Sequence, residues 1–311
     1  MYFPIIRGRQ YDLLAIRELQ SKGLLSEKII PIIEPIKLSP TLLSTVKAFE
    51  DAERKLAIIT NPKVGSFTGE LKFESVFKQY LQMMSSDHVL VCHYLNKESE
   101  EQIDEIINTF KSDLEELILI HSERNLVSLY NSIYDSVLPL ANVIPQDTSF
   151  RRQMRGKNLV GLDDKFNKLL RNADYLEAEQ EFFSEEHLYF NDEGYIGFSD
   201  YSIIGADYNE SGFAPYAVAI HIVFPNSEDA LEIRHFVSDS NEDTSDPAGK
   251  FAEALEKMMK WYSESTLGES METYALDVFK AHYKEGTYPG LPTIKKLSIM
   301  HHLELIGNLL R

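Results

Sequence analysis

Cysteine is almost absent from this chain, and long apolar runs are absent altogether. Cys92 is the only cysteine among 311 residues, so no disulfide can form within the chain. No stretch reaches the roughly 18 consecutive apolar residues that a membrane span needs. The opening MYFPIIRGRQYDLL has neither the basic start nor the apolar run of a signal peptide. We therefore expect a cytoplasmic protein with no membrane attachment, in a reducing compartment.

Positive charge is scarce as well. The chain has 31 Lys and Arg against 49 Asp and Glu, a net charge of −18. Such a field repels phosphate backbones, which argues against general nucleic-acid binding. The one local basic run, FRRQMRGK at 150–157, is interpreted as a solvated connector, and the acidic run DSNEDTSD at 239–246 as an exposed loop.

The familiar local signatures of catalysis and nucleotide binding are missing. NPKVGSFTGE, from Asn61, has two glycines but lacks the GxxxxGK[ST] pattern, so it is not a phosphate-binding P-loop. No GxGxxG follows a strand, no GxSxG elbow occurs, and neither HExxH nor HxH is present. The sequence therefore indicates no particular cofactor, and any site has to be assembled from residues far apart in the chain.

The first two hundred residues repeat a pattern of a short apolar run, a polar residue and a helix-like segment. From Arg7 to His121 the run-ending residues are spaced by 27, 27, 32 and 28 positions. That is about the length of a strand, a helix and two short loops. The expected helices are Gln10 to Lys22, Pro40 to Arg54 (with Ser39 as N-cap), Phe73 to Met84, Glu98 to Phe110 and Asn125 to Tyr134.

Apolar strands without polar alternation are typical of a parallel sheet buried on both faces. Eight such units predict an α/β fold, a (β/α)8 barrel of the TIM type, with a doubly wound open sheet as the competing architecture. We expect residues 1–200 to supply the eight strand units of one domain spanning 1–311. The sixth connector is short, and the seventh, Asp164 to Gly194, contains RNADY, a polar turn that could act as a lid.

Beyond Asp200 the pattern changes. YAVAIHIVF (Tyr216 to Phe224) and LEIRHFVS (Leu231 to Ser238) predict a β-hairpin inserted after the eighth strand, within 201–246. Residues 247–311 are expected to form a helix that completes the eighth unit (Pro247 to Ser263) and a C-terminal helical extension (Glu269 to Tyr283 and Pro292 to Leu310). In-register pairing of the hairpin would make His221 and His235 cross-strand neighbours.

These segments also resemble a known family. YFPIIRGRQYDLLAIREL, IIPIIEPIK, ITNPKVG, GYIGFSDYSIIG, AVAIHIVF, LEIRHFVSD and DPAGKFAEAL resemble the bacterial and phage "beta protein" family, from the first strand to about Leu255. The resemblance implies a barrel-like fold, an origin in bacteria or a mobile element, and a setting near antiphage functions. It implies no reaction.

Every predicted barrel strand ends in a polar residue. The eight are Arg7, Glu34, Asn61, His93, His121, Gln146, Asp163 and Asp200. In β/α barrels the active site lies at this carboxyl end of the strands, so these residues predict a functional rim. The block GFSDY adds Tyr201 beside Asp200, either in a substrate-contacting loop or in a tight exit from the strand.

Several chemistries could use this rim. The candidate catalytic residues are Glu34, His93, His121, Asp163 and Asp200, and the candidate ligand-binding residues are Arg7, Asn61, Gln146 and Tyr201. A carboxylate and a histidine could act as general acid and base, while Arg7 would bind a phosphate or carboxylate. This suits a hydrolase or lyase acting on an anionic small molecule. Glu34, His93, His121 and Asp163 are also ligand types that bind divalent metals, but no local spacing supports a metal site.

A second hypothesis from another class stays open. The chain could be a non-enzymatic sensor or partner subunit of a defence or mobile-element system, which would bind another protein through the hairpin and the C-terminal helices. A barrel fold does not by itself confer catalysis. Under the enzyme hypothesis, Glu34→Gln or His121→Ala should abolish function. Under the partner hypothesis, charge reversals on the hairpin should be the damaging changes.

Overall fold

The computed structural model describes residues 1–209, 215–265 and 271–310. The chain divides into two compact units. Unit 1 comprises Met1–Leu13, Glu27–Asp163 and Tyr189–Asp200, and unit 2 comprises Leu14–Ser26, Asp164–Leu188 and Tyr201–Arg311. All the strands of the predicted barrel belong to unit 1, and the predicted hairpin and C-terminal helices belong to unit 2.

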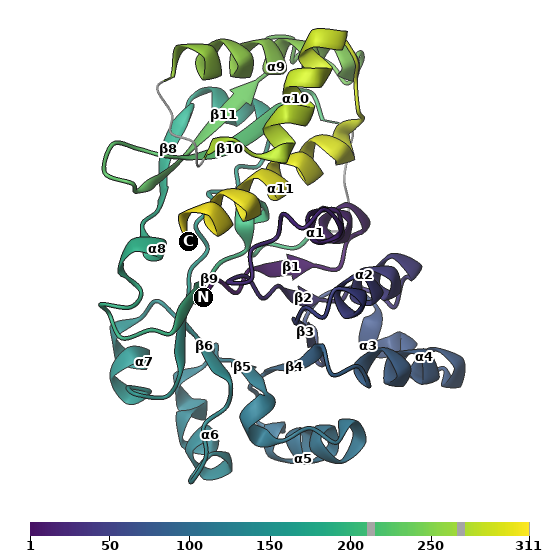
Figure 1. Cartoon of the computed structure of the whole chain (residues 1–311), viewed down its shortest axis with the longest axis vertical. Coiled ribbons are helices and arrows are strands. Elements are labelled where there is room, and N and C mark those ends of the chain that lie inside the picture. Colours follow the sequence, from purple (N-terminus) through teal and green to yellow (C-terminus); the bar gives the residue numbers. More distant parts are fainter. Residues whose placement is uncertain (210–214, 266–270, 311) are drawn as a thin grey trace. The chain divides into compact units, whose positions relative to one another are not determined.

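Unit 1 is built on an eight-stranded parallel sheet with the order β1-β2-β3-β4-β5-β6-β7-β9 (Figure 1). Its strands are β1 (Ile5–Arg7), β2 (Ile32–Glu34), β3 (Leu56–Ile59), β4 (Val89–Tyr94), β5 (Ile118–Ile120), β6 (Ala141–Pro145), β7 (Leu159–Leu162) and β9 (Gly197–Ser199). Nearly every residue of these strands is buried. Burial on both faces explains why they appear in the sequence as continuous apolar runs.

The sheet closes between its first and last strands. The backbone N–H groups of Phe3 and Ile5 donate to the carbonyls of Phe198 and Asp200 at 2.9 and 2.8 Å, and Phe198 N–H donates to Met1 O at 3.1 Å. Gly197 is required there, because a Cβ at this position would lie 2.4 Å from Met1 O. The fold is therefore the predicted (β/α)8 barrel, and the competing open sheet is excluded.

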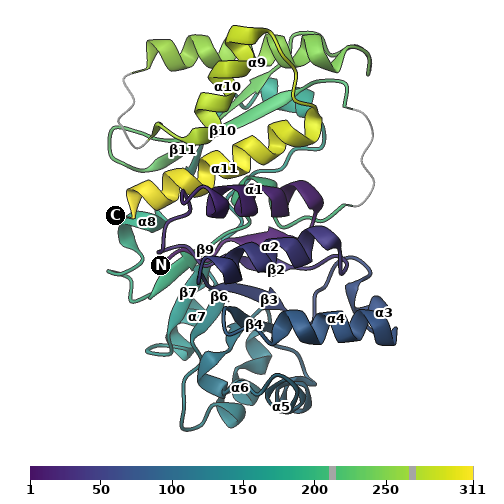
Figure 2. The same cartoon turned by 45° about the vertical axis from the view of Figure 1, so that its right-hand side comes forward.

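Helices follow most of these strands along the chain (Figure 2). They are α1 (Gln10–Ser21), α2 (Pro40–Asp51), α3 (Phe67–Glu70), α4 (Glu74–Met84), α5 (Ser99–Phe110), α6 (Val127–Ile133), α7 (Thr148–Gln153) and α8 (Glu186–Tyr189), with short 3₁₀ turns η1 (Leu114–Glu116), η2 (Arg124–Leu126), η3 (Asn172–Leu176) and η4 (Ser202–Ile204). The predicted cap of α2 is confirmed, because Ser39 Oγ accepts from Leu42 N–H at 3.1 Å.

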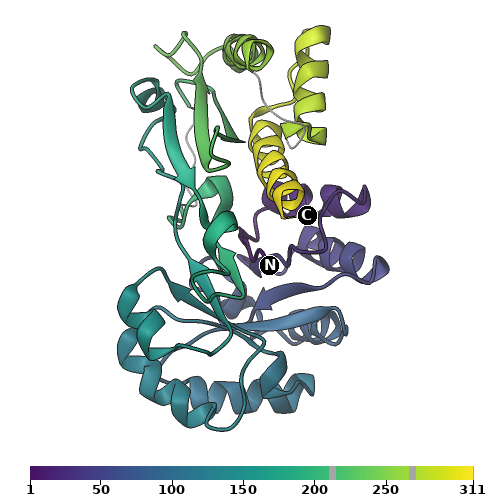
Figure 3. The same cartoon turned by 60° about the vertical axis from the view of Figure 1, so that its left-hand side comes forward.

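Unit 2 contains a three-stranded antiparallel sheet with the order β10-β11-β8. Its strands are labelled in Figure 1, and Figure 3 shows them, in teal to green, from another side. Its strands are β8 (Gln180–Ser184), β10 (Ala219–Pro225) and β11 (Leu231–Val237), and its long helices are α9 (Pro247–Glu264), α10 (Tyr274–Glu285) and α11 (Leu291–Leu309). The predicted hairpin is confirmed as β10 and β11. The helix that was expected to complete the eighth barrel unit is α9, and it packs on β10 and β11. The predicted start of the next helix, Glu269, lies outside the described residues.

Helix α11 is the central helix of unit 2. It packs along β10 and against α10, and every residue from Leu297 to Gly307 is buried. His301 and His302 are both fully buried in it. His301 Nε2 donates to Val223 O at 2.7 Å, and Thr273 Oγ1 lies 2.8 Å from His301 Nδ1, so both ring nitrogens are satisfied. Despite its apolar composition, neither α11 nor any other helix in the described ranges is long and apolar enough to cross a membrane.

Candidate functional site

The strand-end residues predicted from the sequence lie at the carboxyl edge of the barrel in unit 1. Arg7 and Glu34 are the last residues of β1 and β2, and His93 is the last but one of β4. The others follow their strands by one or two positions. Proximity along the edge does not place their side chains in one site, because adjacent residues of a strand point to opposite faces.

Arg7 and Glu34 form a buried ion pair. They are direct neighbours in the β1–β2 register, and Arg7 Nη1 donates to Glu34 Oε2. Their side chains are 7% and 0% exposed. The other carboxylate oxygen, Oε1, accepts the backbone N–H of Lys63 at 2.9 Å. A buried charge is tolerated when it is paired and hydrogen-bonded. The contacts with Arg7 and with Lys63 N–H meet both conditions, and they hold the Glu34 carboxylate in one orientation.

Three further residues join this pair. The Tyr94 hydroxyl donates to Glu34 Oε2 at 3.2 Å. Lys63 Nζ lies 4.4 Å from the centre of the Tyr94 ring, in the range of a cation–π contact, and 3.3 Å from Ser122 Oγ. Unlike Glu34 and Tyr94, Lys63 and Ser122 are exposed. We call Arg7, Glu34, Lys63, Tyr94 and Ser122 the rim cluster.

His93 lies on the opposite face of β4 from Tyr94. Its Nε2 is 3.0 Å from the hydroxyl of Ser99, the first residue of α5, and its Nδ1 is 3.3 Å from Thr60 Oγ1. Burial lowers the pKa of His93 to about 4, so the ring is neutral at pH 7. The structure therefore places His93 between the sheet and a helix, away from Glu34.

His121 has a similar position one strand along. Its Nε2 lies 2.8 Å from Asn142 Oδ1, and its ring packs edge-on against Tyr130 of α6 and Phe150 of α7. The Asn142 amide nitrogen donates to Lys157 O at 2.6 Å, which fixes Oδ1 as an acceptor and His121 Nε2 as the protonated nitrogen. Burial lowers the pKa of His121 to about 4. Nδ1 is buried and has no hydrogen-bond partner in the part of the chain that the structure describes.

The two candidate amides make structural contacts. Asn61 extends the sheet beyond β3, because its side chain donates to Tyr94 O at 2.9 Å and accepts from Tyr94 N–H at 2.8 Å. It thereby fixes the backbone of Tyr94, whose hydroxyl donates to Glu34. Gln146 accepts from the Tyr195 hydroxyl at 3.3 Å and lies over Gly161, where a Cβ would come within 2.6 Å of its amide nitrogen.

Asp163 and Asp200 end the last two barrel strands. The Tyr2 hydroxyl donates to Asp200 Oδ1 at 2.6 Å, and Asp200 is 4% exposed, so this carboxylate ties the first segment of the chain to the last strand. Asp163 donates its backbone N–H to Ser199 O at 3.1 Å, which extends the β7–β9 ladder. Tyr201 belongs to unit 2, where it precedes η4.

The alternative of a metal site requires Glu34, His93, His121 and Asp163 to converge. His93 and His121 instead contact helices α5 and α6. Over residues 1–209, 215–265 and 271–310, the structure contains no group of three or more His, Cys, Asp or Glu side chains that could hold a metal ion.

The hairpin histidines are the cross-strand neighbours that the sequence predicted. His221 and His235 pair in register, with their Nδ1 atoms 2.7 Å apart, and His235 Nε2 lies 3.3 Å from Glu181 Oε2. Tyr175 packs on both rings, with centroids 4.8 and 4.5 Å away. Burial, with a smaller contribution from His235, lowers the pKa of His221 to about 3, so the pair is held without charge on His221.

Lys63, Tyr94 and Ser122 were not among the site residues predicted from the sequence. Lys63 and Ser122 follow the strand-ending residues by one or two positions, and Tyr94 stands beside the predicted His93. The available signal was the alternation of side chains between the two faces of a strand. Arg7 and Glu34 are in register on neighbouring strands, and shifting the phase of β4 by one residue exchanges His93 for Tyr94.

Comparison with known proteins found no relative of this chain. No family model, curated protein or solved structure matches the chain.

Proposed function

We propose that the carboxyl rim of the barrel binds a small anionic molecule. The observation that carries this proposal is the rim cluster, in which an exposed ammonium and hydroxyl, Lys63 and Ser122, lie 3.3 Å apart beside a buried Arg7–Glu34 pair. A phosphate or carboxylate oxygen that displaces this contact would receive one charge-assisted hydrogen bond and one neutral hydrogen bond.

Lys63 is a better candidate than Arg7 for contacting the anion. The charge of Arg7 is already balanced by Glu34, whereas Lys63 forms no ion pair with a carboxylate among the described residues. We therefore assign Lys63 the anion contact, and Arg7 the role of holding Glu34.

The same cluster suggests how a bound anion could react. The Tyr94 hydroxyl donates to the Glu34 carboxylate, so the Tyr94 oxygen can take a proton from the ligand while its own proton passes to Glu34. Hydrolysis or lysis of an anionic small molecule is the reaction class that such an acid–base pair would serve. In this step Glu34 is the final proton acceptor, and Tyr94 is the group that exchanges a proton with the ligand.

Thermal unfolding with small probes tests the binding proposal. We expect inorganic phosphate or malonate to raise the melting temperature of the full chain in a saturable way, and glycerol at equal concentration to leave it unchanged. Lys63→Gln should remove the rise. Lys47→Gln should retain it, because Lys47 is an exposed lysine of α2 that pairs with Glu50 and Asp51.

Either of two results would overturn the proposal. Neither probe shifts the melting temperature, or Lys63→Gln shows the same concentration-dependent rise as the wild-type chain and Lys47→Gln. In both cases the Lys63–Ser122 pair is a surface contact and not an anion site.

The resemblance to the beta protein family supplies a biological setting for this proposal. We propose a bacterial or mobile-element protein whose rim ligand is connected with antiphage function. Plaque counts on cells that express the wild-type chain, Lys63→Gln or Lys47→Gln test this. Protection that depends on Lys63 supports the connection, and equal plaque counts with and without the wild-type chain contradict it.

A protein-binding function is the second candidate, because unit 2 exposes large apolar side chains. Leu170, Leu176 and Phe182 are 95, 47 and 59% exposed, and Phe182 lies on the edge strand β8. Exposed apolar residues near a strand edge are typical of protein contacts. If this function is the principal one, Leu170→Lys or Phe182→Lys should abolish activity in cells, and Lys63→Gln should not.

A further inference from the structure

Unit 2 contains a cavity of about 430 Å³ that lies apart from the hairpin loop. It is lined by the end of η3, by residues 234–237 of β11 and by the second half of α9. Pockets that hold small ligands typically range from about 300 to 1,000 Å³. The cavity therefore has room for a molecule with one ring system and a short polar substituent.

Aromatic rings form much of the wall. Trp261 is fixed in place by Phe224 and Phe236, whose ring centroids lie 5.0 and 5.3 Å from its own. The guanidinium carbon of Arg234 lies 5.7 Å from the Phe236 ring and 5.8 Å from the Trp261 ring. Indole and guanidinium planes are surfaces on which a flat heterocycle stacks.

The charged residues of the lining include one lysine without a carboxylate partner. Arg234, Lys257 and Lys260 line the cavity together with Glu179 and Glu264. Arg234 pairs with Glu179, and Lys257 donates to Asp239 and to the carbonyl of Val237, each at 2.7 Å. Lys260, by contrast, has no carboxylate partner among the described residues. A single anionic group could contact Lys260, while a ligand with several would meet the carboxylates of Glu179 and Glu264.

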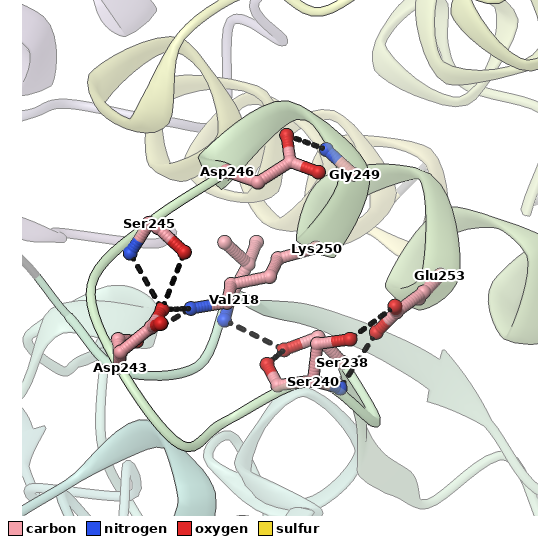
Figure 4. A network of polar contacts seen from close by, with 9 residues as sticks. All are labelled: Val218, Ser238, Ser240, Asp243, Ser245, Asp246, Gly249, Lys250 and Glu253. Carbon is pink, nitrogen blue, oxygen red and sulfur yellow. Dashed lines mark hydrogen bonds and ion pairs between the residues drawn. The ribbon is translucent and has the colours of Figure 1, made fainter.

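Helix α9 is anchored in a way that keeps these groups in position (Figure 4). Glu253 accepts from the backbone N–H and the hydroxyl of Ser240, at 2.8 and 2.6 Å. Asp246 caps the helix by accepting from Gly249 N–H at 2.9 Å, and the buried Lys250 donates to Asp243 O at 2.5 Å. Because both the helix start and the preceding loop are fixed, Lys257, Lys260 and Trp261 project from a rigid element.

We propose that this cavity is a binding site for a small molecule that joins a flat aromatic heterocycle to one anionic group, the chemistry of a nucleoside monophosphate. The heterocycle stacks against Trp261 and Arg234, and the anionic group contacts Lys260. Glu179 and Glu264 accept hydrogen bonds from amino or hydroxyl groups and disfavour ligands of higher charge.

Trp261 is the only tryptophan of the chain, so its fluorescence reports on this cavity alone. Titration of the full chain with AMP should change the emission in a saturable way, and calorimetry should give the same dissociation constant. Adenosine and inorganic phosphate, the two halves of the probe, should each bind more weakly. Lys260→Gln should weaken AMP binding about tenfold or more, the value of one charge-assisted hydrogen bond, and leave adenosine binding unchanged. Lys63→Gln, in unit 1, should change neither.

Three results would overturn the proposal. Calorimetry detects no binding of AMP, or ATP binds more tightly than AMP, or Lys260→Gln binds AMP as the wild-type chain does. A melting temperature of Lys260→Gln within the error of the wild-type value is the check that the variant is folded.

Discussion

The direction in which each strand-end side chain points decides which residues share a site. Tyr94 and His93 are neighbours on β4, yet Tyr94 donates to Glu34 while His93 contacts Ser99 of α5. The same alternation sends His121 towards Tyr130. The rim cluster is therefore a set of residues on one face, and the two histidines belong to the packing between sheet and helices.

The buried Arg7–Glu34 pair gives a first prediction. Glu34→Gln leaves the Arg7 charge buried without a counter-ion, which should lower the free energy of unfolding by about 3–5 kcal/mol. Adding Arg7→Met removes that charge, so the double variant should be more stable than the sum of the single changes predicts. Urea unfolding of the wild-type chain, Glu34→Gln, Arg7→Met and the double variant measures this coupling. Strictly additive effects would show that the two side chains do not interact.

The sequence indicated the polar edge of the barrel but not the composition of the cluster. Arg7 and Glu34 were predicted because each ends an apolar run, and they are in contact. Lys63 and Ser122 lie in loops, where side-chain direction depends on the backbone path. His93 and His121 are packed residues because they contact Ser99 and Asn142, which belong to other elements. The positions of these partners depend on tertiary packing, which the local sequence does not indicate.

Buried histidines give a second prediction, on the pH dependence of stability. Burial lowers the pKa of His93, His121 and His301 to about 4, and of His221 to about 3. The unfolded chain, with histidine pKa values of about 6.5, then binds more protons than the folded chain between about pH 6.5 and 4. The free energy of unfolding therefore has its full value above about pH 6.5. It decreases as the pH falls, by about 2 kcal/mol per histidine at pH 5.

Urea unfolding at pH 7 and pH 5 measures this loss, and the NMR signals of these imidazoles should titrate well below pH 6. An equal free energy of unfolding at the two pH values would contradict the prediction.

At the scale of elements, the anchoring of α9 gives a third prediction. Lys250 is 4% exposed and donates to Asp243 O, within the network that orders residues 238–253. Lys250→Met removes a charged donor, a loss of about 1.5–3 kcal/mol, and should speed backbone hydrogen exchange in this segment. Lys47→Met, on the exposed surface of α2, is the control. Unchanged exchange in residues 238–253 would show that Lys250 does not order the loop.

The long apolar elements were predictable, and the short polar ones were not. All eight barrel strands and the hairpin lie where their apolar runs predicted them, with ends shifted by at most two residues at the rim. Strand β8 was missed because QEFFS is short, stands in an acidic context, and becomes a strand only by pairing with β11. Helix α7 was missed because its six residues, TSFRRQ, contain a single buried side chain, Phe150.

For the whole molecule, two units carry two proposed sites of different chemistry. The rim cluster in unit 1 presents Lys63 and Ser122 to a small anion, and the cavity in unit 2 presents Trp261 and Lys260 to a heterocycle with one anionic group. We expect the two sites to respond to separate substitutions. Phosphate stabilisation should depend on Lys63, and AMP binding on Lys260. Loss of both responses in either single variant would indicate one shared site.

Native mass spectrometry tests the central claim, anion binding at the barrel rim, most directly. The wild-type chain, Lys63→Gln and Lys260→Gln would each be equilibrated with the probe that gives the largest rise in melting temperature. Their intact masses would then be compared with their denatured masses. The account predicts one bound anion fewer on Lys63→Gln than on the wild-type chain and on Lys260→Gln. Equal occupancy of all three proteins, or no bound anion on any of them, would contradict it.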